Sequence, residues 1–272
     1  MHAAKSLMPP RAGSEAVTWM GRLGYAARGV VYLLVGASAG VAAIWPTHRP
    51  AGPSDAVQLG HGHPIGAVFL IAIAFGLACL AGWFTVAGVA SARQATGKGW
   101  WRALGTLGDA VVYIAFMIDV AGIALGLWRG SGERSLQSWI AWLSGWEYGR
   151  PLIGIVGAAV LAGGIGLAVW GVVGNVDRGV ALPQQEARLI RPVARYGIAG
   201  RGAAVALVGC FLLAAAFYGN PREAHEVGGV LAALRSLSYG RVLIGLFGLA
   251  FIGSSLFDFV AAFYRRFDPA AA

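Results

Sequence analysis

Six long runs of apolar residues, separated by short polar segments, dominate the pattern along this chain. They cover residues 25–45, 64–90, 104–127, 150–174, 197–218 and 241–263. At a rise of about 1.5 Å per residue, each run can form a helix that crosses about 30 Å of hydrocarbon. Separate strands are excluded in lipid, because they leave backbone groups without hydrogen-bond partners. The pattern predicts an all-α polytopic membrane protein with six transmembrane helices.

Two connecting segments, 135–143 and 227–237, have a different pattern. Their apolar residues recur at helical spacing beside polar residues. We expect these segments to form helices that lie on the surface of the bundle. Residues 54–59 are a shorter counterpart, with Ser54 as the candidate N-cap.

Composition supports a membrane location. Hydrophobic residues make up 57% of the chain and charged residues only 12%, whereas a soluble domain has about 25% charged residues. The 21 basic residues outnumber the 12 acidic ones. They do not form the long basic stripes with interleaved aromatic residues that are typical of nucleic-acid binding. The expected partner is the lipid bilayer, with no nucleic acid.

The basic residues also indicate an orientation, because Lys and Arg accumulate on the cytoplasmic side of membrane proteins. One side of the six spans carries 13 of them and the other side 7. The richer side comprises Lys5, Arg11, Arg22, Arg28, Arg93, Lys98, Arg102, Arg178, Arg188, Arg191, Arg195, Arg265 and Arg266. We therefore expect a bacterial inner-membrane protein with both termini in the cytoplasm.

The first helices contain an internal repeat. Residues 22–36 and 195–209 are identical at 8 of 15 positions, which include Arg28 and Arg201. Residues 105–113 fit the same frame, but Asp109 takes the place of the arginine. Self-similarity of this kind is typical of proteins built from repeated structural units.

The second helices repeat as well. The segments 148–154 and 239–245 agree at 6 of 7 positions, and 62–66 is a weaker version. Their shared opening motif consists of Tyr148, Gly149 and Arg150 in one segment and Tyr239, Gly240 and Arg241 in the other. The chain thus divides into a tail (1–20) and three two-helix repeats (21–92, 102–176 and 194–267). Because each repeat crosses the membrane twice, all three have one orientation, which predicts a pseudo-threefold axis along the membrane normal.

These motifs resemble an uncharacterised bacterial membrane family with three tandem two-helix repeats, known as a domain of unknown function. The resemblance rests on Arg-x-Gly-x-x-x-Arg-Gly-x-x-Tyr in the first helix and aromatic-Gly-Arg-x-Leu-x-Gly in the second, and it extends from Gly21 to Phe267. Asp109 departs from the first motif, and His63-Pro-Ile-Gly66 departs from the second. The resemblance implies the six-helix architecture and no particular activity.

Ionisable residues within the spans are the candidate functional residues, since each costs on the order of 3 kcal/mol at the bilayer centre. Arg28, Asp109 and Arg201 share one repeat position, and Asp258 lies near the inner end of the sixth span. All four are expected at a similar depth. The arginines either extend to the headgroups beside locally hydrogen-bonded aspartates, or join the aspartates in a charge network between repeats, or form a gate or ion site.

Asp119 is expected near the middle of the membrane, about 15 Å beyond Asp109. It shares a helix face with Ala115, Gly122 and Gly126, a set of small residues typical of helix–helix contacts. This predicts a carboxyl group that faces the bundle. It serves either as a structural hydrogen-bonding group or as a group that handles a proton or cation.

The sequence predicts no enzyme, cofactor or metal site, and it has neither an HExxH zinc motif nor a glycine-rich phosphate-binding loop. Two functions remain open. The bundle either passes or senses a small cation or proton, or it is a non-transporting scaffold or accessory subunit that docks a membrane protein or another copy of itself. Transport requires polar residues with water along the axis, whereas a scaffold is compatible with a dry core.

Overall fold

The computed structural model describes residues 12–45, 48, 50–53, 64–94, 99–127, 132–174, 184–220, 222, 224–225 and 227–265. Its helices are α1 (Ala12–Ile44), α3 (Pro64–Gln94), α4 (Gly99–Ala124), α5 (Gly132–Ser144), α6 (Gly149–Val173), α7 (Gln184–Tyr218), α8 (Val227–Leu234) and α9 (Gly240–Tyr264). Six of them are long and apolar enough to cross a membrane, namely all except α5 and α8. The prediction of an all-α polytopic membrane protein is confirmed.

Several helices begin or end at residues other than those predicted from the apolar runs. α5 and α8 are present where surface helices were expected, whereas segment 54–59 lies outside the described residues. α1 begins at Ala12, inside the expected tail, and α7 begins at Gln184. A helix satisfies its backbone internally, so it can continue beyond the apolar stretch that signals the span.

α4 instead ends early, at Ala124 rather than residue 127. Gly126 has a φ of +69°, its N–H donates to the carbonyl of Ile123, and the N–H of Leu127 donates to the carbonyl of Gly122. This is a Schellman C-cap, which needs a residue in the left-handed region. Gly126 was expected to pack against a neighbouring helix, but its role is to end α4.

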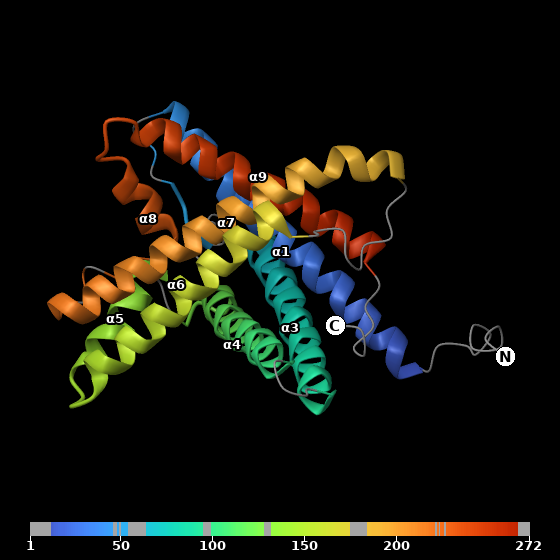
Figure 1. Ribbon diagram of the computed structural model, residues 1–272, viewed down its shortest axis with the longest axis horizontal. Coiled ribbons are helices and arrows are strands. Elements are labelled where there is room, and N and C mark those ends of the chain that lie inside the picture. Colours follow the sequence, from blue (N-terminus) through green and yellow to red (C-terminus); the bar gives the residue numbers. More distant parts are fainter. Residues whose placement is uncertain are drawn as a thin grey trace.

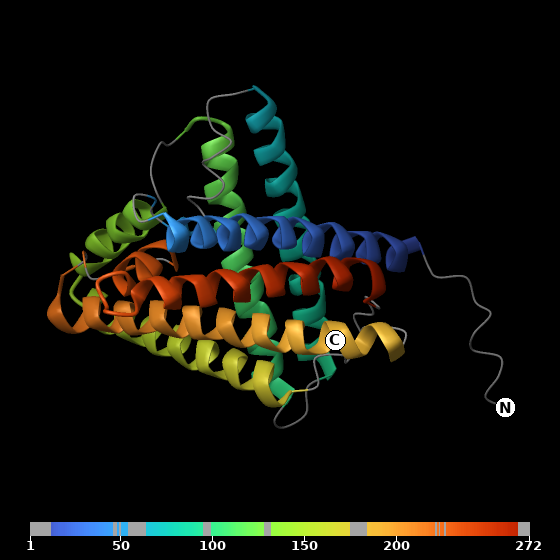
Figure 2. The ribbon, with the colours of Figure 1, turned by 90° about the horizontal axis from the view of Figure 1, so that it is seen from above.

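Four long helices lie side by side in the order α1, α9, α7 and α6, and the hairpin of α3 and α4 crosses them (Figures 1 and 2). Neighbouring helices in this layer run in opposite directions. We call the end of this four-helix layer at which α1 and α7 begin the proximal end (Figure 2). The opposite end, beside α5 and α8, is the distal end (Figure 2).

The helix pairs follow a cyclic rule. The first helix of each repeat packs most extensively on the second helix of another repeat, which pairs α1 with α9, α4 with α3, and α7 with α6. Within repeats, α1 packs on α3 and α7 packs on α9. Among the described residues, α4 and α6 of repeat 2 make no comparable contact. The pairing is therefore cyclic, with a gap between α4 and α6. Because the α3–α4 hairpin crosses the other four helices (Figure 2), the expected pseudo-threefold symmetry is limited to this pairing pattern.

Glycines allow the closest of these helix contacts. A Cβ added at Gly164 in α6 would overlap the backbone nitrogen of Ala206 in α7 and lie 2.7 Å from its Cα. A Cβ added at Gly36 in α1 would lie 2.8 Å from the carbonyl oxygen of Gly248 in α9. Side chains at these positions would push the backbones apart, so the glycines fix the separation of the paired helices.

Candidate functional site

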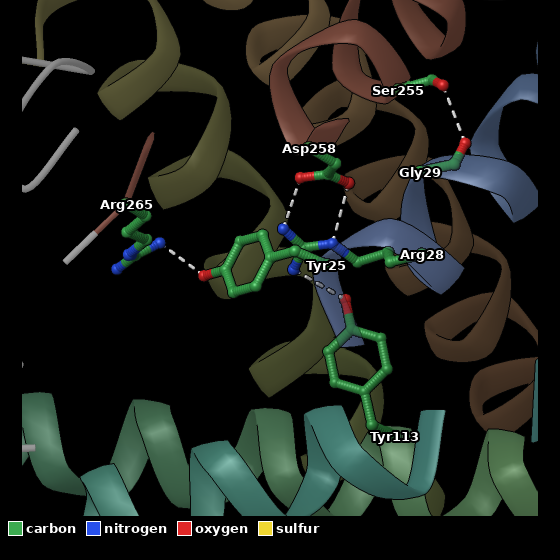
Figure 3. Close-up of polar contacts among 7 residues, drawn as sticks. All are labelled: Tyr25, Arg28, Gly29, Tyr113, Ser255, Asp258 and Arg265. Carbon is green, nitrogen blue, oxygen red and sulfur yellow. Dashed lines mark hydrogen bonds and ion pairs between the residues drawn. The ribbon is translucent and has the colours of Figure 1, made fainter. Parts of the chain in front are cut away.

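The charged centre of the bundle is an ion pair between the first and the last helix. Arg28 of α1 donates from Nε to Oδ2 of Asp258 in α9 (2.8 Å) and from Nη2 to Oδ1 (2.5 Å), as Figure 3 shows. The side chain of Arg28 is 8% exposed and that of Asp258 only 1%. The bidentate geometry satisfies both carboxylate oxygens, which is the arrangement that a desolvated Arg–Asp pair requires.

Two tyrosines complete the surroundings of Arg28. Its guanidinium carbon lies 4.4 Å from the ring centre of Tyr25, and its Nη1 donates to the hydroxyl of Tyr113 in α4 (3.2 Å). Arg265 at the end of α9 donates to the Tyr25 hydroxyl (Figure 3). Aromatic faces and hydroxyl acceptors both stabilise a cation that has lost its water.

Close contact between α1 and α9 places these groups. The hydroxyl of Ser255 in α9 donates to the carbonyl oxygen of Gly29 (2.7 Å), one residue after Arg28 (Figure 3). A Cβ on Gly29 would lie 3.2 Å from the ring of Phe259, so the glycine leaves room for that ring beside Asp258. The repeat motif Arg28-Gly29 therefore combines a charge with the small residue that lets α9 approach it.

Arg201 is equivalent to Arg28 in the repeat but has different neighbours. Its guanidinium carbon lies 5.2 Å from the ring centre of Tyr32 in α1. Arg28 reaches Tyr113, the α4 equivalent of Tyr32, so in both cases an arginine contacts the tyrosine of another repeat. Arg201 forms no ion pair within 4 Å among the described residues.

Asp109 interacts electrostatically with Arg28 and Arg201, and Arg201 also interacts electrostatically with Asp258. The structure thus brings the four candidate charges Arg28, Asp109, Arg201 and Asp258 together, with formal charges that sum to zero. Only Arg28 and Asp258 are joined by hydrogen bonds, whereas Asp109 is exposed on α4. The four residues form a neutral layer with one tightly bound pair.

Asp119 does not join this layer. It lies five residues before the end of α4, in the C-terminal half of the span Ala103–Ala124. Its side chain is half-buried, and Ala115 on the same face is exposed, so the small-residue face is only partly covered. Asp119 forms no hydrogen bond or ion pair with the rest of the described chain.

The arginines of the Tyr-Gly-Arg motif bind the distal ends of other helices. Arg241 donates from Nε to the carbonyl of Ala43 (3.0 Å) and from Nη2 to that of Ile44 (2.8 Å), at the C-terminus of α1. The guanidinium of Arg150 lies beside Gly219, which follows the C-terminus of α7. A cation at this place complements the helix dipole and its unpaired carbonyls.

The other motif residues shape the start of these helices. Tyr148 and Tyr239 are the N-cap residues of α6 and α9 and are 76% and 78% exposed. A Cβ at Gly149 or Gly240 would overlap the carbonyl oxygen of Leu143 or Leu234, in the preceding surface helix. The glycines therefore permit a tight turn from the surface helix into the span.

Apolar residues fill the bundle on the distal side of the charged layer. Val31, Val35, Leu70, Val120 and Phe251, from four different helices, are each no more than 1% exposed. Further toward the distal end, α8 packs against α1 and α9 through Ala39, Ala42, Leu231 and Ile244. A core of buried apolar side chains therefore separates the charged layer from the distal surface.

The described residues hold no group of three or more His, Cys, Asp and Glu side chains that could bind a metal ion. Residues 36–40 read Gly-x-Ser-x-Gly, a pattern that in hydrolases places a nucleophile on a sharp strand-to-helix turn. Here Ser38 lies within α1, and its hydroxyl donates to the carbonyl of Val35 (2.8 Å) and accepts from the N–H of Ala51 (3.1 Å). These contacts fix the segment after α1 and give Ser38 a structural role.

Sequence reasoning missed Tyr25, Tyr32, Tyr113 and Ser255. A signal for two of them existed, since Tyr32 and Tyr113 occupy one position of the repeat, four residues after Arg28 and Asp109. An i, i+4 spacing on a helix by itself favours contacts within that helix. The contacts in fact run between helices, which only the packing of α1 against its neighbours determines.

The six apolar helices define a polytopic α-helical membrane protein. Residues 23–91 and 196–265, together just over half of the chain, match the family described as Domain of Unknown Function (DUF1206), and the chain belongs to this family. The matched segments coincide with repeats 1 and 3, which supports the internal repeat. The resemblance found in the sequence motifs is confirmed.

A relative in Bacillus subtilis (strain 168), named Uncharacterized protein YxxB, is 24% identical over 97% of this chain and 98% of its own length. No solved structure matches the chain. The likeness to the Bacillus protein extends over all six spans, including those of repeat 2. The name of this relative states no activity.

Proposed function

We propose that this protein is a non-enzymatic membrane scaffold or accessory subunit, which binds a partner and does not transport a solute. The observation that supports this proposal best is the core of buried apolar side chains on the distal side of the Arg28–Asp258 pair. An ion or proton pathway along the axis needs polar groups or water at every level, because an unsolvated charge is very costly in hydrocarbon. The bundle instead has buried aliphatic and aromatic side chains there.

The charged layer fits a structural role. Arg28 and Asp258 neutralise each other with two hydrogen bonds, and the ring of Tyr25 lies against the Arg28 guanidinium. Such a pair specifies which helices meet and in what register. A scaffold needs this kind of fixed geometry more than it needs a pathway.

Solvent access along the axis tests the proposal. In a variant with Cys79 and Cys210 replaced by Ala, a cysteine at Val35 should resist a water-soluble thiol reagent, whereas a cysteine at the exposed Tyr148 should react fast. Reconstituted protein should show no flux of H⁺, Na⁺ or K⁺ above that of empty vesicles. Rapid labelling at position 35, or flux that scales with the amount of protein, would contradict the scaffold.

A second candidate, the passage or sensing of a proton or small cation, is favoured by Asp119, which has no partner among the described residues. An intramembrane carboxyl group without a partner is a candidate ion or proton site. If it acts in this way, Asp119→Asn should abolish flux while keeping the fold, because the amide is nearly isosteric. Flux that is equal in the wild type and in Asp119→Asn would exclude this role.

A further inference from the structure

Within the described ranges, the two helices of repeat 2, α4 and α6, do not pack on each other, whereas the equivalent helices of repeats 1 and 3 do. In repeat 1, a Cβ added at Gly24 of α1 would lie 2.6 Å from the Cα of Leu80 in α3. In repeat 3, a Cβ at the equivalent Gly197 of α7 would lie 2.6 Å from the carbonyl carbon of Gly253 in α9 and would overlap the nitrogen of Ser254. One turn further on, Ala27 meets Gly76 in repeat 1, and Gly200 meets Ala250 in repeat 3.

Repeat 2 has the same small residues at the equivalent positions, but they are uncovered. Gly105 and Gly108 of α4 correspond to Gly24 and Ala27, and Ala159 and Gly163 of α6 correspond to Ala250 and Ser254. A Cβ at Gly105, Gly108 or Gly163 would meet nothing within 4 Å, and Ala159 is exposed. α4 and α6 are also the two least buried spans. Each carries one half of an interface whose complete form appears twice in this protein.

Charge complementarity adds an independent observation. Pairing Gly105 with Gly163 and Gly108 with Ala159 sets an antiparallel register. Continued toward the C-terminus of α4, this register places Asp119 opposite residues 148–149, beside Arg150. Asp119 has no partner among the described residues, and Arg150 is exposed, with its guanidinium beside Gly219 at the end of α7. At this register the long side chain of Arg150 could reach the carboxylate of Asp119.

The helices that carry these faces are held firmly. α6 is bound to α7 at Gly164 and Gly202, where an added Cβ would overlap the backbone nitrogen of the partner helix. α4 is bound to α3, and a Cβ at Gly88 would lie 2.7 Å from the side chain of Leu107. Bringing α4 onto α6 of the same chain would have to open at least one of these packed contacts. Packed interfaces resist such continuous deformation.

We propose that a second copy of this chain covers repeat 2, with α4 of each copy packed on α6 of the other. A twofold axis makes the contact reciprocal, so one interface type is formed twice and both open faces of both copies are covered. Asp119 of one copy then meets Arg150 of the other. This inference rests on the proposed scaffold role and names its first partner as the protein itself.

Cysteine cross-linking in native membranes tests the proposal in a background without Cys79 and Cys210. One tagged copy carries Gly105→Cys and a second, differently tagged copy carries Gly163→Cys. Oxidation of membranes that contain both should produce a disulfide-linked heterodimer, and each variant alone should give far less dimer. As a positive control, Gly154→Cys/Ala216→Cys should form a disulfide within one chain, because a Cβ at Gly154 would lie 3.8 Å from that of Ala216.

Two results would overturn the dimer. The first is a Gly105→Cys/Gly163→Cys chain that cross-links within itself while the mixed single variants do not, which would mean that α4 and α6 close on each other. The second is an absence of any cross-link between positions 105 and 163 while the control disulfide forms. Vesicle flux is measured separately, so flux would contradict the scaffold without affecting the dimer, and a missing cross-link would do the reverse.

Dimer fractions from single-molecule photobleaching in membranes provide a second measurement. Gly105→Leu should weaken dimerisation at least about tenfold by filling the groove, whereas Val111→Leu, on another exposed face of α4, should have no effect. Asp119→Asn and Arg150→Gln should each weaken the dimer, and the double variant should be no worse than either, since coupled residues are not additive. Additive losses, or a wild type that is monomeric, would refute the interface.

Discussion

Arg28 and Asp109 occupy the same position of the internal repeat, but the protein treats their charges in opposite ways. Arg28 is enclosed by Asp258, Tyr25 and Tyr113 on the side where α1 meets α9. Asp109 is exposed on α4, on the side where repeat 2 is open. The contrast shows that the repeat sets where a charge lies in the bundle, while the helix packed opposite sets whether that charge is bound.

The largest expected effect is the loss of the buried counter-ion. Asp258→Ala leaves the Arg28 guanidinium buried without its partner, and we expect a loss of about 3–5 kcal/mol in the free energy of unfolding. Asp109→Ala removes an exposed carboxylate that has no hydrogen bond to the described residues, and it should cost less than about 1 kcal/mol. Thermal unfolding in detergent measures both. Equal losses of unfolding free energy in Asp258→Ala and Asp109→Ala would contradict the contrast between the buried pair and the exposed carboxylate.

Two neighbouring glycines compare the covered and open faces of α6. Gly164→Ala should cost about 1–3 kcal/mol, because its Cβ would overlap the backbone of α7. Gly163→Ala should be neutral or stabilise the monomer by up to about 1 kcal/mol, since it has open space and alanine favours helix. Unfolding of monomeric protein in detergent is the measurement. A destabilising Gly163→Ala would mean that α4 already covers this face.

A matched tyrosine pair sharpens the comparison between the two arginines. Tyr113→Phe removes the hydroxyl that accepts from Arg28 and should cost about 1–2 kcal/mol. Tyr32→Phe keeps the ring beside Arg201 and removes a hydroxyl without a hydrogen bond among the described residues, so its effect should be close to zero. Unfolding midpoints of the two variants under one condition decide the point. A larger loss for Tyr32→Phe would contradict the assignment of these contacts.

The smallest and most local expected effects concern the C-terminal ends of α1 and α4. Arg241→Ala exposes two carbonyls of α1 and should cost about 1 kcal/mol, because the contact is at the surface. Gly126→Ala forces alanine into the left-handed region and should cost about 1–2 kcal/mol, but only at α4. Hydrogen exchange of the last turn of each helix separates the two. Faster exchange at α1 in Gly126→Ala would be inconsistent with separate caps.

Much of the fold could be predicted from the sequence, and the reasons are physical. Twenty or more apolar residues in succession have few stable solutions other than a membrane helix, so the six spans follow from composition and length. The repeat placed Arg28, Asp109 and Arg201 in register. It could not show that Asp258 binds Arg28 in preference to Arg201, because that depends on which two helices form the tightest pair.

The open side of repeat 2 was also beyond the sequence. Gly105, Gly108 and Gly163 have the residue types of a packed interface, and their equivalents in repeats 1 and 3 are packed. Residue type reveals that two faces can fit, but whether they meet within one chain depends on the positions of the other helices. The end of α4 at Ala124 was not predicted for a similar reason. The residues before and after Gly126 are both apolar, so the hydrophobic pattern does not mark the glycine C-cap.

The Arg28–Asp258 pair also imposes an order in time. Its two residues are 230 positions apart, in the first and last helices of the chain. At a synthesis rate of 5–20 residues per second, Arg28 waits roughly 10–50 seconds before its counter-ion has been made. During that interval the nascent chain holds an arginine in the membrane without Asp258, and a chain truncated before α9 holds it permanently. We therefore expect chains truncated before α9 to be less stable than the full chain and to be preferred substrates for membrane proteases.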